Sequence, residues 1–167
     1  KNTIATVTTA KKYKINKPVI KSVINSNSLR SKLLLKKINK ILNNKIRNKK
    51  ICFLGVTFKA NTDDMRESSS LEMLPYLSSK GAKIKYYDPT GRKKEFKKIK
   101  NVNFAKTINY AVKGSDLVIL HTEWNDFKSI DFKKLNPSKK LKIFDMRNIF
   151  SPLKIKSQGF EYFGIGK

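Results

Sequence analysis

From residue 50 onward, short apolar runs alternate with helical patterns, and this alternation constrains the fold more than any other feature of the sequence. The runs are KICFLGV, AKIKYYDP, SDLVILHT and LKIFDM, and a final extended segment, GFEYFGIG, follows them. Helical patterns separate the runs at about residues 70–80, 105–113 and 131–135. Short, almost wholly apolar runs are typical of strands that are buried on both faces. The alternation therefore predicts an α/β domain: a Rossmann-like, doubly wound parallel sheet with right-handed crossovers.

The helix expected at 70–80 carries its own start and stop signals. Ser69 and Glu72 have the spacing of a capping box, and Gly81 follows the last helical residue. Pro75 lies inside the pattern and removes one backbone hydrogen bond, so we expect a kink or a later start.

A longer amphipathic pattern precedes the sheet. Between about 19 and 42, apolar residues recur at three- and four-residue steps with lysines opposite: Val19, Val23, Leu33, Leu34, Ile38, Ile41 and Leu42. Pro18 suits the first turn of this helix. The helix is longer than a small core needs, so we expect a partner helix and a homodimer. A weaker helical pattern covers residues 3–15. The polar segment NNKIRNKK places a domain boundary near residue 45, between a helical region (1–45) and the α/β domain (46–167).

Composition bears on the partners and the compartment. The chain has 38 Lys and Arg against 12 Asp and Glu, a formal charge of +26 that can indicate nucleic-acid binding. Only five of the 38 are arginine, the residue that groove-reading surfaces favour. The lysines are spread along the chain with Asn and Ile, which share A- and T-rich codons, so genomic drift accounts for them. A lysine-rich nucleic-acid-binding module stays as the alternative function, and an inactive gene remnant as a third.

No apolar run could span a bilayer, and the single Cys52 cannot form an internal disulfide, so a cytoplasmic location without membrane contact is expected.

The loop between the first strand and the first helix, FKANTDDMRESSS (58–70), concentrates charge. In a sheet of this kind, ligands bind outside the carboxyl ends of the strands, and a helix N-terminus favours phosphate. Lys59 and Arg66 supply two cations there, and Asp63 and Asp64 can form a turn and pair with them. The pattern predicts an anion cradle framed by the aspartates. The alternative is a capped turn with solvated cations. Without a third ligand nearby, the aspartates do not predict a metal site.

Other candidate residues follow the later strands. Arg147 ends the fourth strand at the same edge as the cradle, with a structural salt bridge as the equal alternative. Asp88 stands where dinucleotide folds place a ribose-binding acid, but the glycine fingerprint is absent, so a strand-ending turn is favoured. His121, the only histidine, and Cys52 are interpreted as structural, and Trp124 as a loop or core anchor.

Five segments resemble, in order and spacing, the C-terminal domain of the UDP-glucose/GDP-mannose dehydrogenase family: GVTFKANTDDMRESSSLEML, GAKIKYYDP, SDLVILHTEWNDF, IFDMRNIF and GFEYFGIG. The resemblance covers about residues 50–167 and is strongest to the UDP-glucose 6-dehydrogenases. Residues 1–45 resemble the end of the central helical region, whose long helix forms the dimer core. The resemblance implies that Phe58 and Lys59 line a UDP-sugar site and that Arg147 helps to hold the nucleotide sugar. It also implies that Arg66 reaches the phosphates of NAD.

The resemblance sets limits on activity as well. Members of the family oxidise the C6 hydroxyl of the sugar to a carboxylate in two NAD-dependent steps, through a cysteine-bound thiohemiacetal and thioester. This sequence contains neither the dinucleotide-binding domain nor the catalytic cysteine, and Asn2 stands where a catalytic aspartate is expected. An amide cannot act as a general base. The chain is therefore expected to be a fragment with no catalytic residue that does not turn over substrate alone.

Overall fold

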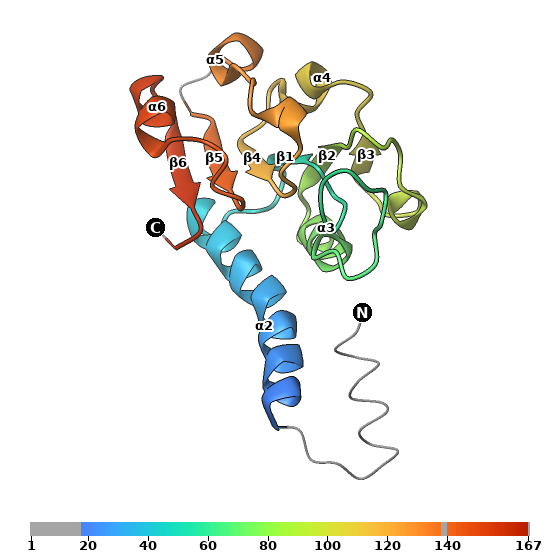
Figure 1. Cartoon of the computed structure of the whole chain (residues 1–167). Coiled ribbons are helices and arrows are strands. Elements are labelled where there is room, and N and C mark those ends of the chain that lie inside the picture. Colours follow the sequence, from blue (N-terminus) through green and yellow to red (C-terminus); the bar gives the residue numbers. More distant parts are fainter. Residues whose placement is uncertain (1–17, 138–139, 167) are drawn as a thin grey trace.

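The computed structural model describes residues 18–137 and 140–166, with side chains from residue 29 onward (Figure 1). Asn2 and the helix predicted for residues 3–15 lie outside the described residues. Within the part of the chain that is described, no helix has the length and apolar character needed to cross a bilayer.

A six-stranded sheet forms the centre of the domain, in the order β3-β2-β1-β4-β5-β6. Every neighbouring pair is parallel, which confirms the predicted α/β, Rossmann-like fold. The order reverses direction between β1 and β4, and this switch point is where doubly wound sheets bind ligands. The strands are β1 (Lys50–Leu54), β2 (Lys83–Tyr87), β3 (Val102–Phe104), β4 (Leu117–Leu120), β5 (Lys142–Asp145) and β6 (Glu161–Gly164).

Helices cover both faces of the sheet (Figure 1). On one face, α2 (Pro18–Ile41) and α3 (Ser70–Ser79) pack on alternate strand residues, among them Ile51, Phe53, Ile84, Tyr86, Leu117 and Ile119. On the other face, the short helices α4 (Ile108–Val112), α5 (Phe132–Leu135) and α6 (Pro152–Ser157) cover Cys52, Leu54, Val118, Leu120, Ile143 and Tyr162. Two short 3-10 turns, η1 (Lys94–Phe96) and η2 (Asn125–Phe127), complete the connections. The central strands β1 and β4 therefore bury both of their faces, as the almost wholly apolar runs predict, whereas the edge strand β3 has no fully buried residue.

The end of α2 explains the polar segment that follows it. Asn43 and Asn44 adopt left-handed backbone conformations, with φ of 51° and 58°. Their amides donate to the carbonyls of Lys40 (2.9 Å) and Asn39 (2.8 Å), the pattern of a Schellman motif. Asparagine tolerates this conformation better than most residues, so the Asn-Asn pair stops the helix.

The last turns of α2 pack on the α/β domain. Leu34, Ile38 and Ile41 are buried in the same apolar cluster as β1 and α3, and Lys142 Nζ donates to the carbonyl of Ile41 (2.8 Å). By contrast, Leu29 and Leu33 are 53% and 62% exposed. A boundary near residue 45 stays a prediction, and the helix that precedes it shares its core with the sheet.

Three details differ from the sequence-based expectation. The capping box is wrong, because Ser69 makes no side-chain cap and its hydroxyl bonds His121 instead. The helix predicted at 105–113 covers only Ile108–Val112, because Ala105 extends the pairing with β2 and Thr107 provides the cap. The edge strand β3 and helix α6 were not predicted, since three and six residues are too few to establish a period.

Candidate functional site

The loop that leaves β1 passes close to the end of β4, and Gly55 makes this approach possible. Gly55 has a φ of +76°, and a side-chain carbon on it would lie 2.5 Å from Cβ of Thr122. Thr122 Oγ1 donates to the carbonyl of Thr57 (2.9 Å), so the loop is bonded across the switch point as well as packed there. Only glycine has both the backbone freedom and the size for this position.

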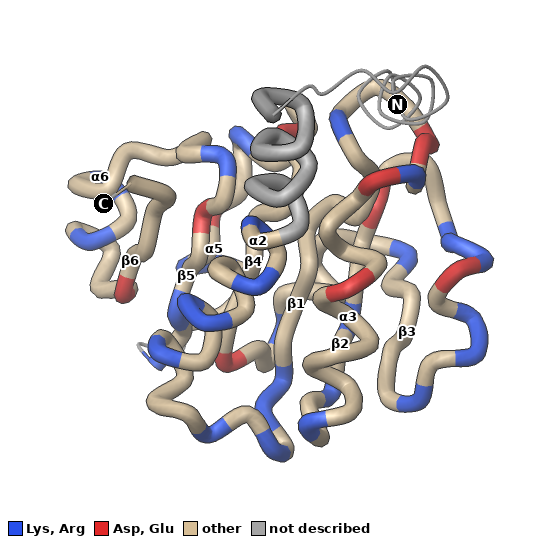
Figure 2. Tube along the Cα trace, turned by 90° about the horizontal axis from the view of Figure 1, so that it is seen from below, with Lys and Arg blue, Asp and Glu red and all other residues tan. Residues whose placement is uncertain are grey.

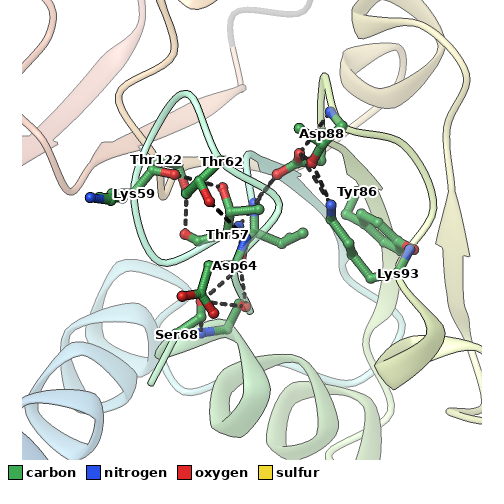
Figure 3. A network of polar contacts seen from close by, with 12 residues as sticks. Thr57, Lys59, Thr62, Asp64, Ser68, Tyr86, Asp88, Lys93 and Thr122 are labelled. Carbon is green, nitrogen blue, oxygen red and sulfur yellow. Dashed lines mark hydrogen bonds and ion pairs between the residues drawn. The ribbon is translucent and has the colours of Figure 1, made fainter. Parts of the chain in front are cut away.

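Asp88, at the end of β2, fixes the beginning of the same loop (Figure 3). Its buried carboxylate accepts from the backbone amides of Val56 (2.8 Å) and Thr57 (3.3 Å), and from Thr90 Oγ1 (2.6 Å). Lys93 Nζ lies 3.7 Å away, and both side chains of this ion pair are almost fully buried. The contacts favour the structural alternative for Asp88 over ribose binding, because the carboxylate is committed to the loop.

Two of the three serines of the loop, Ser68 and Ser70, hold its far end. The hydroxyls of Ser68 and Ser70 both donate to the carbonyl of Val56, at 2.7 and 2.6 Å. They also lie 2.8 Å from each other. The start of the loop, at Val56, is thus tied to the start of α3, at Ser70, 14 positions later in the sequence.

Asp64 has the framing role that the sequence suggests. Its two carboxylate oxygens accept from Nε (2.7 Å) and from the terminal NH2 group (2.8 Å) of Arg66, a two-pronged ion pair. The carbonyl of Asp64 accepts from the amide of Phe58 (2.9 Å), which closes the loop. The side-chain bond to Asp64 raises the pKa of the exposed Arg66 guanidinium. Asp63 is exposed beside this pair.

The fork of Arg66 lies on the wall of an open cavity of about 460 Å³ on the outer side of the loop. The residues that line it come from the loop, α3 and η1: Thr62, Asp63, Asp64, Met65, Arg66, Leu71, Lys94 and Glu95. Because the Asp64 contacts engage two nitrogens of the guanidinium, other N–H donors stay available to a ligand in this cavity.

His121 connects three of these elements from a buried position. Its Nδ1 lies 3.0 Å from Thr122 Oγ1, and its Nε2 lies 2.9 Å from Ser69 Oγ. Since the Thr122 proton is donated to Thr57, Nδ1 must carry the imidazole proton and Nε2 must accept from Ser69. Burial, together with the positive charges of Arg147 and Arg30, lowers the pKa of His121 to about 3. The histidine is a neutral structural group, as the sequence suggests.

Arg147 joins the ends of β4 and β5 to the loop. Its Nε donates to the carbonyl of His121 (2.8 Å) and lies 2.9 Å from Glu123 Oε2, while its NH2 group lies 3.4 Å from the carbonyl of Phe58. The predicted alternative, a salt bridge, is therefore present. It leaves the side chain partly exposed, next to the half-exposed ring of Phe58.

The structure thus places Arg147 next to Phe58 at the carboxyl edge of the sheet, and Lys59 follows Phe58 in the loop. Lys59 is exposed, and its side chain points away from the polar network (Figure 3). Arg66 lies apart from these three, bound to Asp64 on the outer side of the loop. Sequence reasoning missed Glu123, the ionic partner of Arg147, although its place three residues after the end of β4 puts it at the same edge.

Two further interpretations concern the interior. Cys52 is completely buried in β1, and burial raises its pKa well above the usual range, so the thiol is a packing group. Trp124 is buried in the cluster under α5 and α6, as expected for a core anchor. Among residues 18–137 and 140–166, no group of three or more potential ligands could hold a metal ion.

Comparisons with known proteins agree on one family. Residues 52–152 match the UDP-binding domain of the UDP-glucose/GDP-mannose dehydrogenase family. The UDP-glucose 6-dehydrogenase of Rickettsia prowazekii is 35% identical over 158 residues, which are 92% of this chain and 36% of that protein. The enzyme of the same name from Rhizobium meliloti is 33% identical over 168 residues, 100% of this chain and 38% of its own length. This chain thus spans little more than a third of these relatives.

The fold is shared with solved structures as well. A UDP-glucose dehydrogenase from the archaeon Pyrobaculum islandicum superposes with a TM-score of 0.78 at 22% identity, over 97% of this chain and 35% of that one.

Proposed function

Because this chain belongs to the UDP-glucose/GDP-mannose dehydrogenase family, we propose that it binds the nucleotide of a UDP-sugar, as the UDP-binding domain of an NAD-dependent UDP-glucose 6-dehydrogenase. Phe58, Lys59 and Arg147 are the proposed substrate-binding residues. No catalytic residue is assigned to this chain. A cytoplasmic location is part of the proposal, supported by the buried, free Cys52.

The position of Arg147 beside Phe58 at the switch point, with Lys59 next along the loop, is the observation that carries the proposal. Arg147 is held at its Nε and lies within 3.4 Å of the Phe58 carbonyl, so its position is set before a ligand arrives. Lys59 is the neighbouring residue and is free to reach outward (Figure 3). A diphosphate carries charge that both cations can neutralise, and Arg147 can contact it with the donors that His121 and Glu123 leave available.

Calorimetric titration with UDP-glucose tests the site. Lys59→Ala and Arg147→Ala should each weaken binding by about 1.5 to 3 kcal/mol, the range for hydrogen bonds to charged groups. Lys154→Ala, which removes one exposed positive charge from α6, is the matched control and should bind like the parent chain. Binding that all three variants retain would show that the carboxyl edge is not the nucleotide site.

Arg66 is proposed to contact the phosphates of NAD. The fit rests on its exposed guanidinium, which Asp64 orients and which lines the cavity outside the loop. The loop after β1 lacks the glycine fingerprint of a dinucleotide site, so we assign this chain one contact with NAD rather than the binding of the whole cofactor. Arg66→Ala should leave UDP-glucose binding by this chain unchanged and should weaken NAD use where a complete dehydrogenase carries the corresponding change.

A homodimer through α2 completes the proposal. Leu29 and Leu33 lie one helical turn apart and are both more than half exposed, whereas Leu34 and Ile38 face the core of the domain. An exposed apolar stripe on a long helix suits a second copy of the same helix. Leu33→Asp should reduce the mass measured by light scattering toward that of a monomer. Leu153→Asp, at an 81% exposed position on α6, should not. Equal masses for both variants and the parent chain would remove α2 from the interface.

A further inference from the structure

We propose that a second anion site, for a compact polyphosphate, lies at the amino edge of the sheet, opposite the nucleotide site. A cavity of about 300 Å³ opens there. It is lined by residues at or near the beginnings of β1, β2 and β3 and in the turn between α4 and β4: Lys50, Ile51, Lys83, Ile84, Lys85, Asn101, Asn103, Lys113 and Ser115. Four of these are lysines and none is a carboxylate.

The strand register places the lysines side by side. Lys50 and Lys83 are direct partners on β1 and β2, and Lys85 is paired with Asn103 of β3. Alternation puts all of these side chains on the face that α4 covers, since Cys52, two residues after Lys50, belongs to that face. Neighbouring strands lie only about 4.8 Å apart, so like charges in register repel each other.

One of the four ammonium groups is already positioned. Lys85 Nζ donates to the carbonyl of Tyr110 (3.1 Å) and lies 4.2 Å from the centre of its ring, so α4 holds it in place. Lysine has three donors, and the contact with the carbonyl uses one of them. Because this ammonium group is already held in place, less side-chain entropy is lost when an anion binds.

The acidic residue beside the cavity, Asp116, neutralises only part of the positive charge of the four lysines that line it. Asp116 lies beside the cavity, where it accepts from the amide of Lys50 (2.8 Å) and pairs with Lys49 Nζ (3.7 Å). One carboxylate, already paired with a fifth lysine, does not balance the four that line the cavity. In Figure 2, basic positions gather where β1, β2 and β3 begin, and the acidic positions of the loop after β1 lie toward the opposite edge.

The size and lining of the cavity identify the ligand class. A volume of about 300 Å³ is at the lower end of the range for small-molecule pockets, which suits a short phosphate chain. Ammonium and amide donors match its oxygens, and three or more negative charges match the lysines. The lining has no aromatic residue on which bases could stack, and no arginine, so it differs from a nucleic-acid groove. Free triphosphate and the phosphate chain of a nucleoside triphosphate share this chemistry.

Titration of the whole 167-residue chain with inorganic triphosphate, at about 0.1 M salt where long-range charge is screened, tests the site. Lys50→Gln/Lys83→Gln should weaken binding roughly tenfold or more. Lys154→Gln/Lys156→Gln removes the same charge from α6 and should bind like the parent chain. Lys59→Ala should also bind normally, which separates this cavity from the nucleotide site. Lys113→Gln is a second test variant: Lys113 lines the same cavity but lies outside the strands, and its loss should also weaken triphosphate binding.

Each outcome of these titrations either supports or overturns the proposed triphosphate site. Selective loss in Lys50→Gln/Lys83→Gln and in Lys113→Gln supports the site. Comparable affinity for triphosphate and ATP then assigns recognition to the phosphate chain, and tighter ATP binding adds a contact with the nucleoside. Equal weakening in the α6 variant means a diffuse charge effect and overturns the proposal. So does loss in Lys59→Ala alone, absence of binding, or binding of duplex DNA without triphosphate. Unfolding of the strand variant is monitored by its melting temperature, which should not fall, because two repelling charges are removed.

Discussion

Gly55→Ala tests whether the contact between the loop and Thr122 governs stability. An alanine there would keep a φ of +76°, which costs an L-residue about 1 to 2 kcal/mol. Its methyl group would also lie 2.5 Å from Cβ and 2.8 Å from Oγ1 of Thr122. Forcing extra carbon into a packed site costs about 1 to 3 kcal/mol, so we expect a total loss of about 2 to 5 kcal/mol in the free energy of unfolding.

Urea unfolding followed by fluorescence measures this loss, and Gly91→Ala is the matched control. Gly91 has a similar φ of +87°, but no atom lies within 4 Å of the position its side chain would take. The control should therefore lose only the conformational part, about 1 to 2 kcal/mol. If both variants were equally stable, the clash with Thr122 would have no cost, and the account of the switch point would be wrong.

The same substitution should affect binding. Thr122 can avoid the methyl group only by moving, which breaks its bond to the carbonyl of Thr57, one residue before Phe58. Gly55→Ala should thus weaken UDP-glucose binding in calorimetry, and Gly91→Ala should not.

Two further predictions concern buried charge. Asp88→Ala leaves Lys93 buried without its partner and should cost about 3 to 5 kcal/mol in urea unfolding, whereas Asp88→Ala/Lys93→Met should recover part of this loss. A double variant as unstable as the single one would show that the buried ammonium is not the cost. For His121, the folded pKa of about 3 lies below the ordinary value of 6.5, so the unfolded chain binds the proton between these pH values and stability falls as pH falls. Between pH 7 and pH 5 the parent chain should lose about 2 kcal/mol more than His121→Gln, and identical pH profiles would contradict the assigned burial.

The sheet was predictable because its signals are local and repeated. Each apolar run is long enough to identify a strand, and the helix between β1 and β2 has ten residues with an apolar pattern. The three-residue β3 depends on pairing with β2, which a local window does not contain. Ser69 illustrates the same limit in a side chain. Its spacing to Glu72 suits a cap, but the tertiary contact with His121 determines where the hydroxyl points.

The candidate site residues show the same limit: some follow from local sequence signals, and others only from the fold. Lys59 and Arg66, which are proposed binding residues, were predicted from a charged loop after a predicted strand, and Asp64 was predicted to pair with them because it lies in the same loop. Glu123 and Thr122 act through residues far away in the sequence, Arg147 and Thr57, so only the fold reveals their roles.

The loop after β1 carries two consecutive aspartates, Asp63 and Asp64, in a chain that has only 12 acidic residues. The loop holds two cations, Lys59 and Arg66, and three acids, Asp63, Asp64 and Glu67, so its own carboxylates can fix the direction of a cation. Asp64 orients Arg66 on the outer side of the loop, and Asp88 holds the amides of Val56 and Thr57 at its inner end. Lys59 lies between these anchors and is left to extend into solvent (Figure 3). The backbone is thus fixed before any ligand binds, so an anion at this edge would need to order little more than one flexible lysine.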